Sequence, residues 1–218
     1  MTTSPETPVE ALGAVREAEA RLLAIVAPLD DATMDRPSLL AGWTVAQLCT
    51  HLARNADSHV RRTAAAMAGV VVDQYPGGLA ERSADIEAGT GRTAAVVRAD
   101  VEASTARLLD AWSDVPDHAW ANVTRDASGG LRRLDELPAR RWLEVEVHLV
   151  DLGCGPTHRD WSDAFVSAYL PELRAGAAAR LSAGDELPTA DRVDPRDELA
   201  WLFGRLERDD LPRLGPWQ

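Results

Sequence analysis

The sequence contains no lysine, and all 23 of its basic residues are arginine. This absence excludes chemistry that needs a lysine amine, such as a Schiff base or the lysine of a P-loop. Acidic residues outnumber basic ones by 35 to 23, which gives a formal net charge of −12. Nucleic acids and anionic membrane surfaces both require a basic binding surface, so neither is expected to be a partner.

Cysteine is also scarce. Cys49 and Cys154 are too few for a disulfide framework or a cysteine-rich zinc site. No hydrophobic run approaches the roughly 18 residues of a membrane span. The first residues lack the basic and apolar segments of a signal peptide, so we expect a cytoplasmic protein. With 218 residues and 45% hydrophobic residues, the chain is expected to fold around one main core.

Hydrophobic residues recur at helical spacing along most of the chain. The pattern predicts long helices over residues 8–29, 44–69, 93–112 and 137–152, and further helical segments over 79–88, 161–181 and 194–206. Thr44 is expected to cap the second helix and Gly153 to end the fourth. A small hairpin is expected near Ser128. The predicted fold class is mainly α, with a four-helix bundle over residues 1–155 and a small C-terminal region over 156–218.

One predicted helix carries three polar residues on a single side. Glu144, His148 and Asp151 are spaced i, i+4 and i+7, and their immediate neighbours are apolar. His51 lies beside apolar positions of the second long helix and can point into the same bundle. Two imidazoles and one carboxylate leave an open position on a divalent metal of the zinc or iron class. The alternative is a hydrogen bond between Glu144 and His148 with no metal.

Other residues that can bind metals are expected to lie elsewhere. His59 is expected on a solvated face of its helix, and His118 and His158 are expected in exposed loops. Glu146 lies on a different side of the helix from Glu144, and Cys49 is expected to be a small core residue. Metal binding is therefore predicted for a single group of residues.

Two segments of the chain resemble the signatures of mycothiol-dependent maleylpyruvate isomerases, which belong to the DinB-like four-helix metalloenzymes. Residues 39–56, with Gly-Trp-Thr at 42–44 and the histidine at 51, resemble the family's GWT…H signature. Residues 141–153 resemble its second signature, R-x-x-E-x-x-x-H-x-x-D-L-G. The C-terminal tail, with Gly204-Arg205, Leu211-Pro212 and Pro216-Trp217, resembles the family's closing GR…LP…PPW pattern.

This resemblance implies a metal site and a thiol cofactor. His51, Glu144 and His148 would bind zinc or another divalent metal, and Asp151 would orient a ligand. Mycothiol would bind at the open position, where the metal favours its thiolate. Addition of the thiolate to the cis double bond of maleylpyruvate, rotation about the resulting single bond and elimination would release fumarylpyruvate.

The resemblance also implies a substrate that carries carboxylates. Arginine binds a carboxylate with two parallel hydrogen bonds, and Arg205 and Arg82 are the expected binding residues. The alternative for both arginines is a surface ion pair. Residues 182–193 leave too little chain for the several strands that the family carries there. We therefore expect a short, reduced C-terminal appendage of helices with little β structure.

Two other functions are consistent with the sequence. One is a mycothiol S-transferase, in which the thiol stays attached to another electrophile. The other is a non-catalytic helical metal-binding protein. The expected partners are a small electrophile and a low-molecular-weight thiol, in a monomer or a homodimer. The absence of lysine suggests a GC-rich actinobacterial genome, which agrees with the use of mycothiol.

Overall fold

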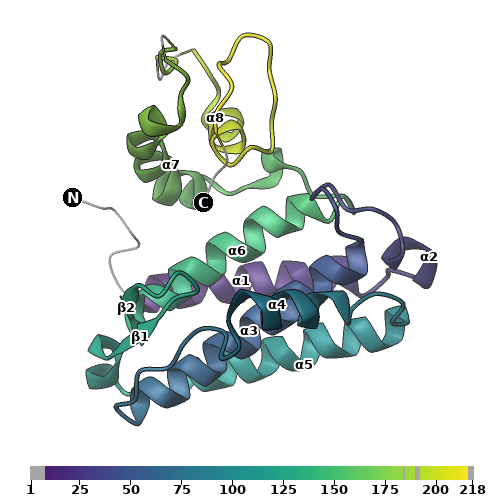
Figure 1. Ribbon diagram of the computed structural model, residues 1–218, viewed down its shortest axis with the longest axis vertical. Helices are drawn as coiled ribbons and strands as arrows, with labels where there is room; N and C mark the ends of the chain where they lie inside the picture. Colours follow the sequence, from purple (N-terminus) through teal and green to yellow (C-terminus); the bar gives the residue numbers. More distant parts are fainter. Residues whose placement is uncertain (1–7, 184, 190–191, 216–218) are drawn as a thin grey trace. The chain divides into compact units, whose positions relative to one another are not determined.

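The computed structural model describes residues 8–183, 185–189 and 192–215, and its elements are labelled in Figure 1. Its α-helices are α1 (Pro8–Val26), α2 (Asp31–Met34), α3 (Val45–Met67), α4 (Gly78–Glu87), α5 (Ala94–Ser113), α6 (Leu137–Asp151), α7 (Asp163–Ala177) and α8 (Pro195–Leu202). The chain divides into two compact units, one formed by Thr7–Cys154 and the other containing Gly155–Gln218.

The four long helices of the first unit pack side by side in a ring with the order α1, α5, α3, α6, and α4 packs on α3 (Figure 1). Aliphatic side chains that are at most 1% exposed fill the space between them: Val15, Leu22, Val45, Leu48, Leu52, Val97, Val101, Leu108, Val145 and Leu149. Removal of these apolar stripes from water stabilises the bundle. The predicted mainly helical, DinB-like four-helix fold is confirmed.

The start of α3 is fixed by a capping box. The Thr44 hydroxyl accepts a hydrogen bond from the Gln47 backbone at 3.2 Å, and the Gln47 side chain accepts one from the Thr44 backbone at 2.9 Å. These two bonds satisfy backbone donors that a helix start leaves free. The cap predicted at Thr44 is confirmed. It fixes the residue at which α3 begins, and His51 lies about two turns into this helix.

The ends of α6 also follow from the sequence. Pro138 lies in the first turn, where its missing N–H group has no helical partner to lose. Gly153, with φ +63°, allows the chain to turn just after the helix, as predicted. Glu146 is 3% exposed and pairs with Arg21 of α1 at 2.9 Å, so its carboxylate holds two helices together.

Gly89 marks a close approach between the segment after α4 and helix α3. A Cβ atom added at Gly89 would lie 2.4 Å from the Thr50 hydroxyl and 2.9 Å from the Ile86 carbonyl oxygen. Because Thr50 is buried and bonded to Ala46, it has no room to move. We expect Gly89→Ala to lower the free energy of unfolding by about 2 kcal/mol, measured by urea denaturation.

Gly13 provides the matched control for this substitution. It lies within α1, and no atom would lie within 4 Å of an added Cβ. Gly13→Ala is expected to raise the free energy of unfolding by about 0.5–1 kcal/mol, since alanine favours the helix. Effects of the same sign for the two variants would refute the steric explanation.

The loop between α5 and α6 contains the predicted hairpin. Strands β1 (Val123–Arg125) and β2 (Leu131–Arg133) pair antiparallel, and Asp126 accepts hydrogen bonds from Ser128 and Gly130 in the turn between them. The short helix α2 was not expected from the pattern, because a single turn is too short to show periodicity. The Asp30 side chain caps it by accepting a bond from the Thr33 backbone.

The C-terminal unit packs α7 and α8 against a small apolar cluster formed by Ala177, Val193, Trp201, Leu202 and Leu211. The Asp194 side chain caps α8, and proline follows it, as predicted. The helix ends earlier than expected, because Gly204, with φ +71°, turns the chain. The described part of residues 182–193 contains no strand, although Leu181 and Leu214 form an isolated bridge. Pro216 and Trp217 lie outside the described residues.

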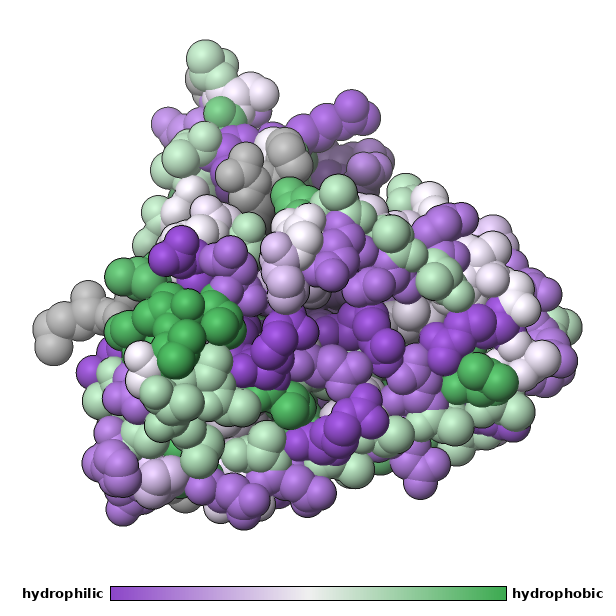
Figure 2. All heavy atoms as spheres, turned by 60° about the horizontal axis from the view of Figure 1, so that its bottom comes forward, coloured by the Kyte–Doolittle hydropathy of each residue, from purple (hydrophilic) through white to green (hydrophobic). Residues whose placement is uncertain are grey.

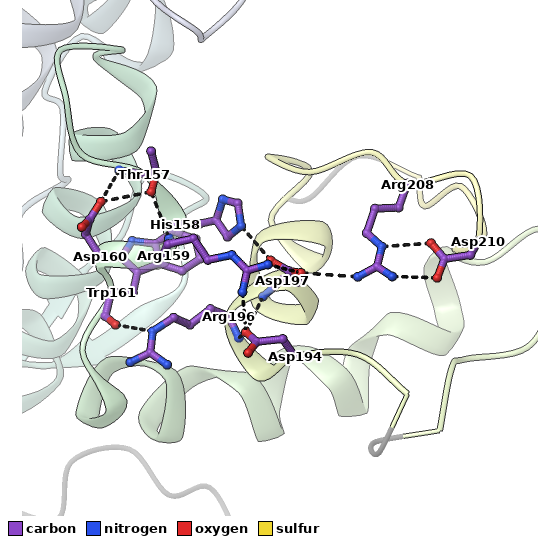
Figure 3. Close-up of polar contacts among 10 residues, drawn as sticks. All are labelled: Thr157, His158, Arg159, Asp160, Trp161, Asp194, Arg196, Asp197, Arg208 and Asp210. Carbon is purple, nitrogen blue, oxygen red and sulfur yellow. Dashed lines mark hydrogen bonds and ion pairs between the residues drawn. The ribbon is translucent and has the colours of Figure 1, made fainter.

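Asp197 lies at the centre of a polar network within this unit (Figure 3). Its carboxylate contacts His158 at 2.8 Å, Arg159 at 2.5 Å and Arg208 at 3.4 Å. The His158 side chain is only 17% exposed, so the expectation that this histidine lies in an exposed loop is wrong. Arg208 also pairs with Asp210, and the network therefore links the start of α8 to the segments before and after it (Figure 3).

Hydrophilic residues cover much of the face shown in Figure 2, and strongly hydrophobic residues form one larger group at the left and smaller spots elsewhere on it. The large hydrophobic side chains that are more than half exposed are Leu39, Val70, Leu79 and Leu131 among the residues described. No helix in this part of the chain combines the length and the apolar character that crossing a bilayer requires.

Candidate metal centre

His51, Glu144 and His148 meet in the interior of the bundle. His51 belongs to α3, and the other two residues lie one turn apart on α6. The Nε2 atom of His51 lies 2.6 Å from Oε1 of Glu144, and the Nε2 atom of His148 lies 3.6 Å from the same oxygen. One ligand atom from each residue lies within 4.8 Å of the other two, and no other such group occurs among the described residues.

The protonation states of the three side chains follow from burial and mutual contact. Burial lowers the pKa of His51 to about 4, so this imidazole is neutral at pH 7. Burial by itself would raise the pKa of Glu144, but hydrogen bonds with His148 and His51 hold it well below its usual value. Burial opposes protonation of His148, yet bonds to Asp151 and Glu144 raise its pKa. The cluster therefore holds an ionised carboxylate between two imidazoles.

Asp151 orients His148 from behind. Its Oδ2 atom lies 2.8 Å from Nδ1 of His148, and the aspartate is 1% exposed. The proton on Nδ1 is shared with this carboxylate, which fixes the orientation of the ring so that Nε2 faces Glu144. The backbone carbonyl of Asp151 also accepts a hydrogen bond from Leu39 at 2.7 Å, which ties the segment before α3 to the end of α6.

The chemistry of this donor set fits a divalent metal. It combines two imidazole nitrogens with one carboxylate oxygen, and the histidine on α6 has the kind of carboxylate partner that metal-bound histidines usually have. Three protein ligands leave a coordination position for a further molecule. A site of this composition is typical of catalytic metal centres and is compatible with several divalent metals.

Arg82 lies beside this cluster. Its NH2 atom is 3.3 Å from Nδ1 of His51, and its guanidinium carbon lies 5.6 Å from the ring centre of Trp43 and 5.9 Å from that of Tyr75. Two aromatic rings thus hold the cation in place. Arg82 forms no ion pair with a carboxylate among the described residues, so its positive charge remains available.

A buried ion pair lies one helical turn from the metal cluster. Arg141 donates to Glu19 at 2.7 Å, and its NH1 atom donates to the Leu52 carbonyl and the Asn55 side chain, each at 2.9 Å. Arg141 and Glu19 are each 1% exposed. These contacts connect α1, α3 and α6. The role of Glu19 is not predictable from the sequence, because one acidic residue on an amphipathic helix has no distinctive pattern.

The remaining sequence candidates lie elsewhere. His59 is buried at 2% exposure against Trp112, so its predicted place on a solvated face is wrong. The error arose because α5, α6 and α4 cover α3 on several sides. His118 is exposed, as predicted, and Cys49 is fully buried in the core, as predicted. Arg205 belongs to the C-terminal unit, where it donates to the Phe203 carbonyl at 2.7 Å.

The fold and the cluster together define a class of protein. A four-helix bundle in which two helices present histidine and glutamate side chains to each other is typical of DinB-like metalloproteins. Residues 15–153 match the family of the mycothiol maleylpyruvate isomerase N-terminal domain. Because this match covers more than half of the chain, the protein belongs to that family.

Solved structures support the same fold. The crystal structure of the mycothiol-dependent maleylpyruvate isomerase aligns with a TM-score of 0.87 and 22% identity, over 100% of both chains. A histidine-to-alanine mutant of that enzyme aligns equally well. YfiT from Bacillus subtilis, described as a probable metal-dependent hydrolase with an unusual four-helix bundle topology, aligns with a TM-score of 0.54 and 16% identity. That alignment covers 69% of this chain and 86% of YfiT. No curated protein sequence matches the chain significantly.

Proposed function

We propose that the protein is a metal-dependent isomerase that uses mycothiol to convert maleylpyruvate to fumarylpyruvate. The observation that carries this proposal is the convergence of His51, Glu144 and His148 beside the unpaired cation of Arg82. Membership of the family and the fold shared with a maleylpyruvate isomerase support the named reaction. The description of YfiT as metal-dependent supports a metal in this fold.

His51, Glu144 and His148 would hold the metal, and we propose zinc. When bound, the metal would stabilise the thiolate of mycothiol, whose reversible addition turns the cis double bond into a rotatable single bond. Asp151 keeps His148 in the tautomer that presents Nε2 to the cluster. His51 is almost fully buried and neutral, so the protein part of the site is largely dry, which strengthens electrostatic interactions within it.

Arginine side chains would bind the substrate carboxylates. Arg82 is held between Trp43 and Tyr75, so little side-chain freedom is lost when its guanidinium binds an anion. The bound carboxylate would lie next to His51 and thus close to the metal ligands. Arg205 of the C-terminal unit remains a second proposed carboxylate-binding residue, on the strength of its match to the GR segment.

Product analysis tests the reaction. Purified protein loaded with zinc is incubated with mycothiol and maleylpyruvate, and the products are separated by chromatography. We expect fumarylpyruvate and full recovery of the free thiol. A stable thiol adduct would instead identify an S-transferase, and absence of any conversion would leave a non-catalytic metal-binding protein.

Arg82→Met is expected to raise KM for maleylpyruvate by about 10- to 100-fold, since a hydrogen-bonded charge contact contributes about 1.5–3 kcal/mol. Steady-state kinetics measure this effect. Arg16→Met, which removes an exposed arginine of α1, is the control and should leave KM unchanged. Equal KM values for the two variants would exclude Arg82 from substrate binding.

A further inference from the structure

Arg62 of α3 is a buried cation without a counterion. The residue is 1% exposed, and it forms no ion pair with a carboxylate among the described residues. Its Nε atom donates to the Thr124 hydroxyl at 3.0 Å, and NH1 donates to the Gln74 side chain at 3.3 Å. The NH2 atom is buried and has no hydrogen-bond partner.

The surroundings of Arg62 do not compensate its charge. Burial and, to a smaller extent, the neighbouring Arg140 lower the pKa of Arg62 to about 10. Asp126 acts in the opposite direction, but this carboxylate is ion-paired with Arg132 at 2.8 Å. An unpaired buried charge costs several kcal/mol, so a protein retains it only where the charge has a use. An anion at NH2 would supply the missing partner.

Tyr75 connects Arg62 with Arg82. The Tyr75 ring lies against the Arg82 guanidinium, and its hydroxyl lies 3.5 Å from the side-chain nitrogen of Gln74, the residue that binds Arg62. Gln74 and Tyr75 both line a cavity of about 350 Å³. Asp73 and Asp126 also line this cavity, but each is paired with an arginine of the hairpin. Of the two arginines without carboxylate partners, Arg82 therefore contacts the buried Tyr75 directly and Arg62 is linked to it through Gln74.

We propose that Arg62 is a second anion-binding residue of the site, and that it takes one carboxylate of a dicarboxylate substrate while Arg82 takes the other. This inference rests on the proposed function for the choice of a dicarboxylate. The observations that support it are the NH2 atom of Arg62, which has no hydrogen-bond partner, and Gln74, which binds Arg62 and lies beside the tyrosine that contacts Arg82. Because a guanidinium presents its donors in a fixed fork, the free side of Arg62 suits a planar carboxylate.

Binding measurements with two matched probes test this assignment. Maleate carries two carboxylates, and monomethyl maleate has the same carbon skeleton with one. Isothermal titration calorimetry on the zinc-loaded protein is expected to show tighter binding of maleate. In Arg62→Met, the affinity for maleate should fall at least about tenfold, whereas the affinity for the monoester should change little.

Stability provides an independent readout. Since Arg62→Met removes a buried, uncompensated charge, its unfolding midpoint in urea should equal or exceed that of the unchanged protein. A residue with a purely structural role would give the opposite result. Failure of Arg62→Met to fold, or a large loss of stability with unchanged maleate binding, would therefore overturn the proposal. Arg62→Lys keeps the charge and should bind maleate more tightly than Arg62→Met does.

Neighbouring variants identify the source of any effect. Arg54→Met, about two turns earlier on α3, should leave maleate affinity unchanged, since Arg54 pairs with Asp57 and Asp100. The proposal would be overturned if Arg205→Met lost the preference for maleate while Arg62→Met kept it. It would also be overturned if Arg62→Met lost affinity for inorganic phosphate but not for maleate. Product analysis separates the two hypotheses. If the preference for maleate requires Arg62, the role of Arg62 is supported even when no fumarylpyruvate forms. If Arg62→Met isomerises maleylpyruvate with unchanged KM, only the role of Arg62 is contradicted, and the proposed isomerase activity is not.

Discussion

His148→Ala is expected to abolish metal binding and catalysis together. His148 supplies one of only three candidate ligand atoms, and its Nε2 atom is already oriented by Asp151. Removal of residues that merely orient a ligand costs about 10- to 100-fold in metal affinity, so loss of the ligand itself should cost more than 100-fold. Elemental analysis of the purified variant should show less than a tenth of the metal per chain found in the unchanged protein.

The control for this experiment is His118→Ala, which removes an exposed histidine outside the cluster. Its metal content and activity should match those of the unchanged protein. Asp151→Asn should show an intermediate metal affinity, since it keeps a hydrogen-bonding group beside His148 but loses the charge. Full metal occupancy in His148→Ala would show that the ligand assignment is wrong.

Arg141→Met is expected to produce the largest loss of stability among the substitutions considered. It removes three hydrogen bonds and leaves Glu19, which is 1% exposed, without its ion-pair partner. Breaking one side of a buried ion pair costs about 3–5 kcal/mol, because the remaining charge stays out of water. Urea denaturation of the metal-free protein measures this effect separately from metal binding.

A double-mutant cycle separates the pair from its surroundings. Glu19→Gln combined with Arg141→Met should be less destabilising than the sum of the two single substitutions, because the double variant leaves no unpaired charge. Arg133→Met provides the surface comparison, since Arg133 and Asp135 form an exposed pair at 2.5 Å. This change should lower the free energy of unfolding far less than Arg141→Met does, because exposed ion pairs contribute little. Additive effects of Glu19→Gln and Arg141→Met would argue against a coupled pair.

Local signals in the sequence predicted much of the bundle. Thr44 is a good capping residue placed just before an apolar period, and Gly153 follows the last apolar turn of α6, so both ends were predictable. The end of α8 was less predictable, because apolar residues continue past the turn at Gly204. Helix α2 was missed since four residues give no measurable period.

Some residues of the candidate site were likewise predictable from local sequence, whereas the positions of others depend on how the helices pack. Glu144 and His148 share a helix, so their spacing alone placed them on one face. His51 and Arg82 come from other helices. The apolar positions beside His51 indicated that it points into the same bundle, whereas Arg82 was named only through the family resemblance. His59 and Arg62 were misjudged or overlooked because charged neighbours suggest a solvated face, whereas helices packed around α3 bury both residues.

The sequence separation of the cluster has a consequence for folding. His51 and Glu144 are 93 residues apart, and the intervening chain contains α4, α5 and the hairpin. A metal shared by these residues would act as a reversible cross-link that closes this long loop. In a chain-entropy description, closing a loop of such length costs the unfolded ensemble about 4.6 kcal/mol of conformational freedom. Metal supply would then govern how long the folded chain survives as well as what it can catalyse.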